Sequence, residues 1–257
     1  MEIELDIRRS AIENAAHHYE QAKKYREKAV GAKKAIEDTK RKLEAGGPQK
    51  KAVKVRKEAA PREWYEAFHW FRSTDGFLVI GGRDARQNEI IVAKHMSPED
   101  VFLHADVHGA PATVIKAEGR AVPEATLRQA AQFAAAYSSA WKSGQTEADA
   151  YAVKPQQVSK QAPSGEFLAK GAFMIRGERQ WFRRMPLKLV LGFEEGKLVV
   201  WPAESKKEGI PVEPGPTEKG PLAEQIRKLL LAKYKTEADA DEIARTLPPG
   251  KGRVAKS

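Results

Sequence analysis

The chain has 257 residues, 31% of them charged, and its formal net charge of +10 fits a polyanion partner such as nucleic acid as well as it fits a solvated basic surface. It contains no cysteine, which excludes a disulfide framework, thiolate catalysis and a Cys-ligated zinc site. The N-terminus has no signal-peptide core and no apolar run approaches the roughly 18 residues of a membrane span, so we expect a cytoplasmic protein without a membrane partner.

The first segment, residues 1–60, is predicted to form a helical coiled-coil arm. Ser10 and Glu13 have capping-box spacing, and small or apolar residues recur every three or four positions from Ile12 to Leu43. This stripe is narrow and rich in alanine, so the helix needs a partner helix, from a second copy or from another protein. A Gly-Gly-Pro sequence ends the helix, and residues 49–60 then form either a returning antiparallel helix or a linker.

Residues 61–203 are predicted to form an α+β domain, with a mixed or antiparallel sheet and packed helices. A short amphipathic helix is expected after Pro61, with the rings of Trp64, Phe68 and Phe71 on one face. We interpret these rings as packing anchors, with base stacking as the alternative. An Asp-Gly turn then precedes a short apolar strand at Phe77–Ile80.

The sequence GGRDARQN, from Gly81 to Asn88, is expected to be a functional loop between two strands, the second at Glu89–Lys94. Two glycines allow a ligand to approach backbone N–H groups, and Arg83 and Arg86 can fork onto phosphate. A Walker or dinucleotide-binding loop is excluded, because the spacing does not match and no helix is expected to follow.

A strand is predicted at Val101–His108 (VFLHADVH), where His104, Asp106 and His108 would project to the same face. Two imidazoles and a carboxylate are a plausible metal-binding group. A polar strand end that faces another kind of ligand has the same pattern, so both interpretations stay open.

The remaining elements are mostly apolar strands and one long helix. They are predicted at Ala112–Lys116, Pro123–Lys142 (the helix), Asp149–Lys154 and Gly171–Phe182, and as a hairpin within Leu187–Trp201. Residues 204–257 are predicted to be a linker and a helical tail. Their expected parts are a linker over Pro202–Pro221, helices at Leu222–Tyr234 and Ala238–Leu247, and an end of order at Pro248–Lys251.

Several segments between Trp64 and Trp201 resemble, in consistent order, the RNA-binding domain of the NFACT family of ribosome-associated quality-control proteins. They are WYEAFHWFRSTDGFLVIGGRDARQNE, HMSPEDVFLHADVHGAP, QFAAAYSSAWKSG, DAYAVKPQQVSKQAPSGEFLAKGAFMIRG and LKLVLGF. The preceding LDIRRSAIENAAHHYEQAKKYREKAVGAKKAIEDT resembles the second part of the family's coiled coil, and the tail ending DEIARTLPPGK resembles the archaeal branch. The family's tRNA-engaging N-terminal domain has no counterpart here, so the resemblance implies a shortened chain.

The resemblance implies a non-enzymatic module, without cofactor or metal, that docks on RNA of the large ribosomal subunit or on tRNA. Basic side chains would supply phosphate contacts, and the Asp84–Asn88 and histidine side chains would bond bases or 2′-hydroxyls. The candidate RNA-binding residues are Arg72, Asp75, Arg83, Asp84, Arg86, Gln87, Asn88, His104, Asp106, His108, Lys154, Lys160, Arg176 and Arg179.

Three alternatives remain at this stage. The first is a metal-dependent phosphoesterase or nuclease that uses His104, Asp106 and His108. The second is a protein-interaction scaffold, in which the arm binds a partner and the α+β domain is passive. The third is a DNA-binding domain, which the resemblance also implies, because this is the role expected of some chains that carry only this domain type.

Overall fold

The computed structural model describes residue 5 and residues 10–44, 63–161 and 168–255, which fall into two units, Met1–Pro61 and Arg62–Ser257. In the first unit α1 (Ala11–Glu44) is a helix of 34 residues. Ser10 caps it, since its backbone N–H donates to Glu13 Oε2 at 2.8 Å and its Oγ accepts from the Glu13 N–H at 3.3 Å. The helix prediction is confirmed, coiled-coil pairing stays a prediction, and the returning helix at 49–60 lies outside the described residues.

Within the described ranges, no helix combines the length and apolar composition that crossing a membrane requires.

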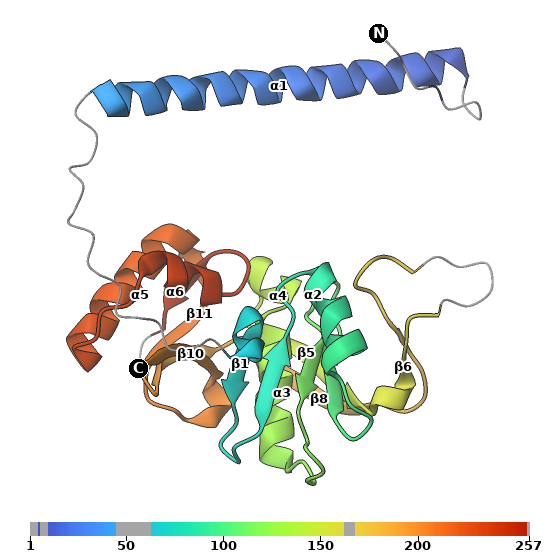
Figure 1. The fold of residues 1–257 in the computed structure, drawn as a ribbon, viewed down its shortest axis with the longest axis vertical. Coiled ribbons are helices and arrows are strands. Elements are labelled where there is room, and N and C mark those ends of the chain that lie inside the picture. The colour runs from blue at the N-terminus through green and yellow to red at the C-terminus, as the bar shows by residue number, and fades with distance from the viewer. Residues whose placement is uncertain (1–4, 6–9, 45–62, 162–167, 256–257) are drawn as a thin grey trace. The chain divides into compact units, whose positions relative to one another are not determined.

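The second unit is built on an antiparallel sheet of six strands in the order β1-β2-β4-β3-β5-β8. Figure 1 shows this sheet with helices packed around it, which confirms the α+β class. The strands are β1 (His69–Arg72), β2 (Leu78–Gly81), β3 (Val101–Ala105), β4 (Thr113–Ile115), β5 (Glu147–Val153) and β8 (Gln180–Pro186).

Both faces of this sheet are covered, because alternate strand residues enter two different apolar clusters. On β2, Val79 joins the cluster of α3 (Glu124–Ala136), whereas Ile80 joins the cluster on the opposite face. Five alanines of α3 are fully buried, so its backbone packs close to the strands. The opposite face is covered by η1 (Trp64–Ala67), α2 (Ala85–Ile90), the π-helical η2 (Ile91–His95), and the hairpin of β6 (Val158–Ser159) and β7 (Met174–Ile175). The short η3 (Pro155–Gln157) directly precedes β6.

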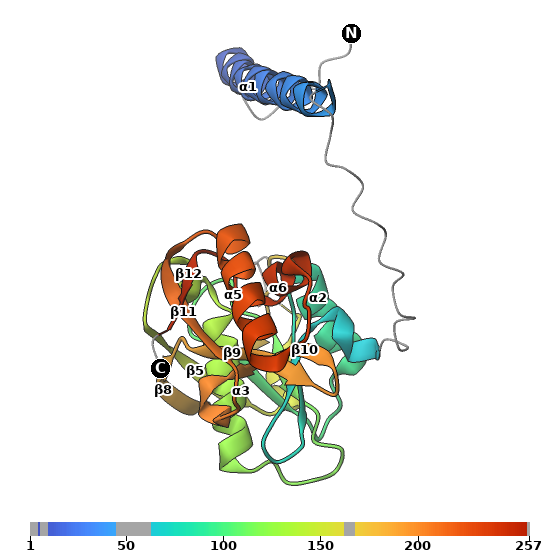
Figure 2. The same cartoon turned by 90° about the vertical axis from the view of Figure 1, so that its left-hand side faces the viewer.

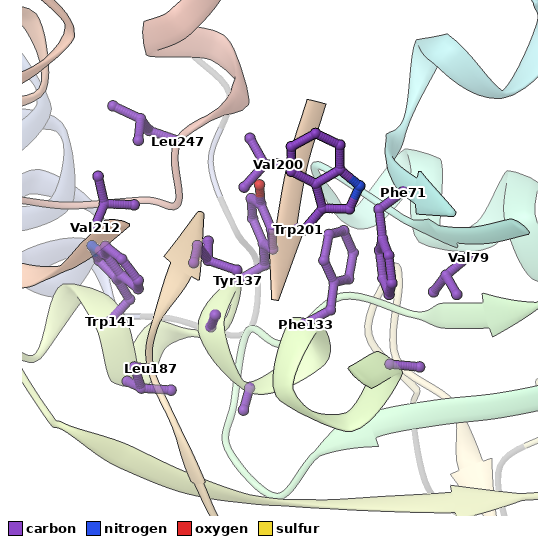
Figure 3. Close-up of a cluster of buried hydrophobic side chains, with 14 of the residues drawn as sticks. Phe71, Val79, Phe133, Tyr137, Trp141, Leu187, Val200, Trp201, Val212 and Leu247 are labelled. Carbon is purple, nitrogen blue, oxygen red and sulfur yellow. The ribbon is translucent and has the colours of Figure 1, made fainter. Parts of the chain in front are cut away.

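A second antiparallel sheet, of four strands in the order β10-β9-β11-β12, extends the α3 cluster. In Figure 3, Tyr137 and Trp141 from the end of the α3 region meet Val200, Val212 and Leu247 from the C-terminal part of the chain. The C-terminal residues therefore complete the main core. The remaining elements of the second unit are α4 (Ser139–Lys142), β9 (Leu189–Glu194), β10 (Lys197–Pro202), η4 (Ala203–Ser205), β11 (Ile210–Thr217), α5 (Lys219–Tyr234), α6 (Ala240–Thr246) and β12 (Gly252–Val254).

The strand predicted at Glu89–Lys94 is wrong, because the segment is helical in α2 and η2. Its run of β-branched residues is typical of a strand, but the Asp84 side chain accepts the Gln87 N–H at 2.8 Å and so starts a helix. Ile91 is then fully buried against the sheet. The expectation that no helix follows the Gly-Gly loop is wrong for the same reason.

The helix predicted after Pro61 is also wrong within the described residues. A single 3₁₀ turn, η1, is followed at once by β1, so the predicted aromatic residues do not share one helical face. Phe68 and Phe71 are buried in the two different clusters, and exposed Trp64 stacks on His95 with ring centroids 4.5 Å apart. The rings nevertheless pack within the protein, as the packing interpretation expected.

Three further boundaries differ from the sequence predictions. The helix predicted at Pro123–Lys142 is divided, because the Ser138 hydroxyl accepts the Ala140 N–H at 3.2 Å and starts α4. The linker predicted at Pro202–Pro221 contains β11, which pairs with β9 and β12. The ordered structure does not end at Pro248–Lys251, because β12 follows and forms an edge strand of the second sheet. The strands predicted at Phe77–Ile80, Ala112–Lys116 and Asp149–Lys154, the hairpin within Leu187–Trp201 and the two C-terminal helices are confirmed.

A buried ion pair joins the beginning of β3 to the end of β4. The carboxylate of Asp100 is buried and pairs with Lys116, whose ammonium is mostly buried as well. The same carboxylate accepts the backbone N–H groups of Ser97 at 2.8 Å and Ala117 at 2.9 Å. These contacts hold the turn between η2 and β3 against the sheet.

Replacing Asp100 with Asn leaves the Lys116 ammonium without its counter-charge in a largely dehydrated site. We expect Asp100→Asn to lower the free energy of unfolding by about 3 kcal/mol. Urea denaturation of the full chain measures this change. The matched control is Glu118→Gln, which removes the exposed partner of Arg120 and should change stability by less than about 1 kcal/mol. Equal effects of the two substitutions would contradict the structural role of Asp100.

Candidate nucleic-acid interface

A cavity of about 1070 Å³ lies at one end of the six-stranded sheet. Its wall includes the beginning of β1, the end of β3 and the connection from β3 to β4. The beginning of α2 and residues 170–173, which precede β7, form a second side. The beginning of α5 and the end of α6 add a third side, so segments far apart in the sequence enclose one space.

The turn between β2 and α2 is fixed by Gly82 and Asn88. The Gly82 N–H donates to Ala112 O at 3.2 Å, and the Ala112 N–H donates to Asn88 Oδ1 at 3.0 Å. A Cβ on Gly82 would lie 2.1 Å from that same Oδ1, so the turn closes only with glycine. Asn88 lines the cavity but is buried, and its carboxamide oxygen supports β4.

Arg83 follows this turn and is held in a defined position at the cavity. Its guanidinium donates to Phe68 O at 2.9 Å, and its backbone N–H donates to Gln87 Oε1 at 3.0 Å. The Gln87 side chain also donates to Ala67 O at 3.1 Å. Arg83 therefore brings a charge to the wall, whereas Gln87 is occupied with bracing the turn.

The three residues of the His-x-Asp-x-His pattern line the cavity but do not share one strand face. β3 ends at Ala105, so Asp106 and His108 lie in the following loop, and the prediction of a common strand face is wrong. Burial lowers the pKa of His104, while hydrogen bonds to the backbone of Ala105 and Ala110 and the charge of Asp106 act in the opposite direction. In the described part of the chain, no group of three His, Cys, Asp or Glu residues is arranged to hold a metal. The phosphoesterase alternative therefore has no metal-binding group behind it within the described residues.

His69 and Tyr137 form a part of the cavity wall that the sequence did not suggest. Their rings pack with centroids 4.1 Å apart, and the Tyr137 hydroxyl donates to Thr246 O at 2.6 Å. Burial holds the pKa of His69 well below its usual value, and the positive charges of Arg83 and Lys219 lower it further. His69 is thus neutral at neutral pH and adds no charge to the cavity.

The cavity carries an excess of positive charge. Among the described residues its wall has five cationic side chains and two carboxylates, and one of the carboxylates, Asp84, already caps α2. Lys170, Lys219 and Arg245 were not among the predicted contacts. Nothing local in the sequence distinguishes these three from solvated lysines and arginines. The cations are Arg83, Lys170, Arg179, Lys219 and Arg245, and the carboxylates are Asp84 and Asp106.

A row of stacked side chains runs from the cavity along β8. The guanidinium of Arg179 lies 4.5 Å from the ring centroid of Tyr151 and 5.7 Å from that of Trp181. Arg183 covers Trp181 at 3.9 Å and pairs with Asp149 at 2.6 Å. Cation–π contacts with two rings therefore hold the Arg179 guanidinium at the cavity wall.

The structure brings seven of the predicted contact residues together at the cavity and leaves the other seven elsewhere. Asp75 accepts the Thr126 hydroxyl at 2.7 Å, and Lys160 pairs with Glu89. These two side chains are thus engaged within the protein. The residues at the cavity are Arg83, Asp84, Asn88, His104, Asp106, His108 and Arg179, and the others are Arg72, Asp75, Arg86, Gln87, Lys154, Lys160 and Arg176.

Comparisons with known proteins agree with the sequence resemblance. Residues 67–177 match the family model described as the NFACT protein RNA binding domain. The archaeal Rqc2 homolog aRqcH of Methanocaldococcus jannaschii is 42% identical over 212 residues, which cover 79% of this chain and 30% of that protein. The human ribosome quality control complex subunit NEMF is 39% identical over 188 residues, which cover 71% of this chain and 17% of that protein. A solved structure of the C-terminal part of a fibronectin/fibrinogen-binding protein from Streptococcus suis aligns with a TM-score of 0.40 and 18% identity, covering 69% of this chain and 77% of that one.

The contact between Gly82 and Asn88 can be tested with a pair of glycine substitutions. Gly82→Ala should lower the free energy of unfolding by about 2 kcal/mol, because the added methyl group must displace the Asn88 carboxamide. Gly31→Ala is the control, since no atom lies within 4 Å of its added Cβ and the residue lies inside helix α1. Chemical denaturation should show the control unchanged or slightly more stable. A Gly82→Ala protein as stable as the control would refute the contact.

Burial of neutral His69 makes stability depend on pH. The folded-state pKa lies below the unfolded value of about 6.5, so between the two values the unfolded chain binds the extra proton. Stability should therefore fall as pH drops below about 6.5, by up to about 1.4 kcal/mol per pH unit from this residue. Denaturation at pH 7 and pH 5 should show a smaller fall for His69→Phe than for the original chain. Identical falls would contradict the assignment of a neutral, buried His69.

Proposed function

Because residues 67–177 are an NFACT RNA-binding domain, of the kind found in ribosome quality control proteins, we propose that this chain is a non-catalytic module that docks on ribosomal RNA of the large subunit or on tRNA in stalled complexes. The observation that carries the proposal is the cationic cavity within and next to the matched residues. Its excess positive charge, the rings in its wall and its position at strand ends suit a polyanion that also has flat bases. The site of action would be the cytoplasm.

Within this proposal the predicted contact residues divide into two roles. Arg83 and Arg179 are ordered by protein contacts and keep their charges at the cavity, so they contact RNA phosphates. Exposed Arg86, Lys154 and Arg176 extend the basic surface outside it. Gln87 and Asn88 are bonded inward and brace the turn that carries Arg83, and Asp75 is bonded to Thr126, so these three side chains do not contact RNA themselves.

The arm has a separate part in the proposal. Large apolar side chains on α1 are exposed within its own unit, as expected of a helix that pairs with another chain segment. We infer that α1 associates with a partner helix, from a second copy or from another component of the same complex. These exposed residues are Ile12, Tyr19, Tyr25, Val30 and Ile36.

Fluorescence anisotropy with a labelled single-stranded RNA tests the proposal. Affinity should fall steeply as salt is raised from 50 to 200 mM, with a log–log slope of roughly −0.7 per phosphate contacted. A flat response over this range would refute electrostatic RNA docking.

Arg179→Gln should weaken RNA binding about tenfold, because it removes a fixed charge from the cavity and the guanidinium that lies over the Tyr151 ring. Arg128→Gln is the matched control, since Arg128 lies outside the cavity wall and pairs with Glu204 at 2.9 Å. The same anisotropy measurement compares the two. Equal affinities for both variants would remove Arg179 from the interface.

A further inference from the structure

The C-terminal part of the chain contributes two cations to the cavity. Lys219 is the first residue of α5, and Arg245 lies in the last turn of α6. Both lie beyond residues 67–177, which match the family model, yet both line the same cavity as Arg83. Figure 2 shows α6 between α5 and α2, so three segments distant in sequence meet at this end of the cavity.

These three cations lack carboxylate partners among the described residues. The guanidinium of Arg83 is hydrogen-bonded to carbonyl oxygens alone, and Glu218, next to Lys219, pairs with Lys251 at 2.7 Å. Burial lowers the pKa of Lys219, and no nearby negative charge opposes that effect. A half-buried ammonium that has no counter-charge is unfavourable unless an anion joins it.

The two neighbouring ring side chains, His69 and Tyr137, add no negative charge beside these cations. His69 is neutral, and the Tyr137 hydroxyl donates to Thr246 O. Donors and positive charge are thus concentrated at one end of the cavity. A phosphate group, with several oxygen acceptors and a negative charge, has the matching chemistry.

The opposite end of the cavity is aromatic and of mixed polarity. The ring centroids of Phe102 and Phe173 are 6.1 Å apart, and those of His104 and Tyr151 are also 6.1 Å apart. Asp106 lies near this group, because its charge acts on both His104 and Tyr151. Rings together with a hydrogen-bond acceptor suit a base with exocyclic donors.

We propose that this cavity binds a single-stranded segment of RNA, with a phosphate between Arg83, Lys219 and Arg245 and a base against the rings at the other end. This inference rests on the proposed RNA-binding function and specifies its ligand. A cavity of about 1070 Å³ has room for a few nucleotides. A base stacked inside a duplex cannot enter it, whereas a base from a loop or a free end can.

The test compares a labelled single-stranded RNA oligonucleotide with the same strand hybridised to its complement. We expect the full chain to bind the single strand at least tenfold more tightly. Lys219→Gln and Arg245→Gln should each weaken that binding by about five- to tenfold through loss of a charged contact. Lys228→Gln is the matched control, because Lys228 is exposed on the same helix as Lys219 but does not line the cavity.

A second measurement on the unsubstituted chain is independent of any folding defect in the variants. Acylation of lysine amines, followed by mass spectrometry, should show Lys219 protected by the single-stranded RNA and Lys228 unprotected. Equal affinity for duplex and single strand would overturn the inference. It would also be overturned if Lys219→Gln and Arg245→Gln bind as tightly as Lys228→Gln while Lys219 stays reactive in the presence of RNA. Either result would leave the proposed RNA binding intact. A chain that binds no RNA in a salt-dependent manner would overturn the proposed function as well.

Discussion

The site depends on one close contact, between the backbone of Gly82 and the side chain of Asn88. Because Gly82 has no Cβ, the Asn88 carboxamide reaches the N–H of Ala112 and joins the beginning of α2 to β4. This contact sets the direction in which the chain leaves β2. It also places Arg83 where its guanidinium meets Phe68 O at the cavity. The same turn directs Ile91 onto the sheet, so the position of the charge and the covering of the sheet's second face follow from one constraint.

The other half of the cavity depends on packing over long sequence distances. The α3 cluster includes residues from both sheets, and Tyr137 and Trp141 hold the C-terminal segment through bonds to Thr246 O and Lys251 O. Figure 3 shows these rings beside Val212 and Leu247. Since the C-terminal helices are fixed by this core, their cations reach the cavity wall, although no local sequence pattern predicts that position. The family match ends at residue 177, but Lys219 and Arg245, which lie beyond it, also line the cavity.

What the sequence predicts well are features with a local physical cause. The hairpin is one example, because Glu195 and Gly196 both take positive φ angles that suit its two-residue turn. The segment at Glu89–Lys94 shows the opposite case, since the cap at Asp84 and the burial of Ile91 outweigh the strand preference of β-branched residues. For the site, the sequence pattern identified the polar residues near Gly82 as candidate contacts. It did not show that Gln87 and Asn88 are hydrogen-bonded to backbone groups of the protein itself. Lys219 and Arg245 could not be found, because only tertiary packing brings them to Arg83.

The central claim is that RNA occupies the cavity at the end of the six-stranded sheet. Photo-crosslinking of a single-stranded RNA to the full chain, with the modified peptides mapped by mass spectrometry, tests it most directly. The account predicts crosslinks in peptides that contain Tyr151, Phe173 or Lys219, which come from three separate segments around the cavity. Crosslinks confined to surfaces away from the cavity, such as the exposed side of α5 around Lys228, would contradict it.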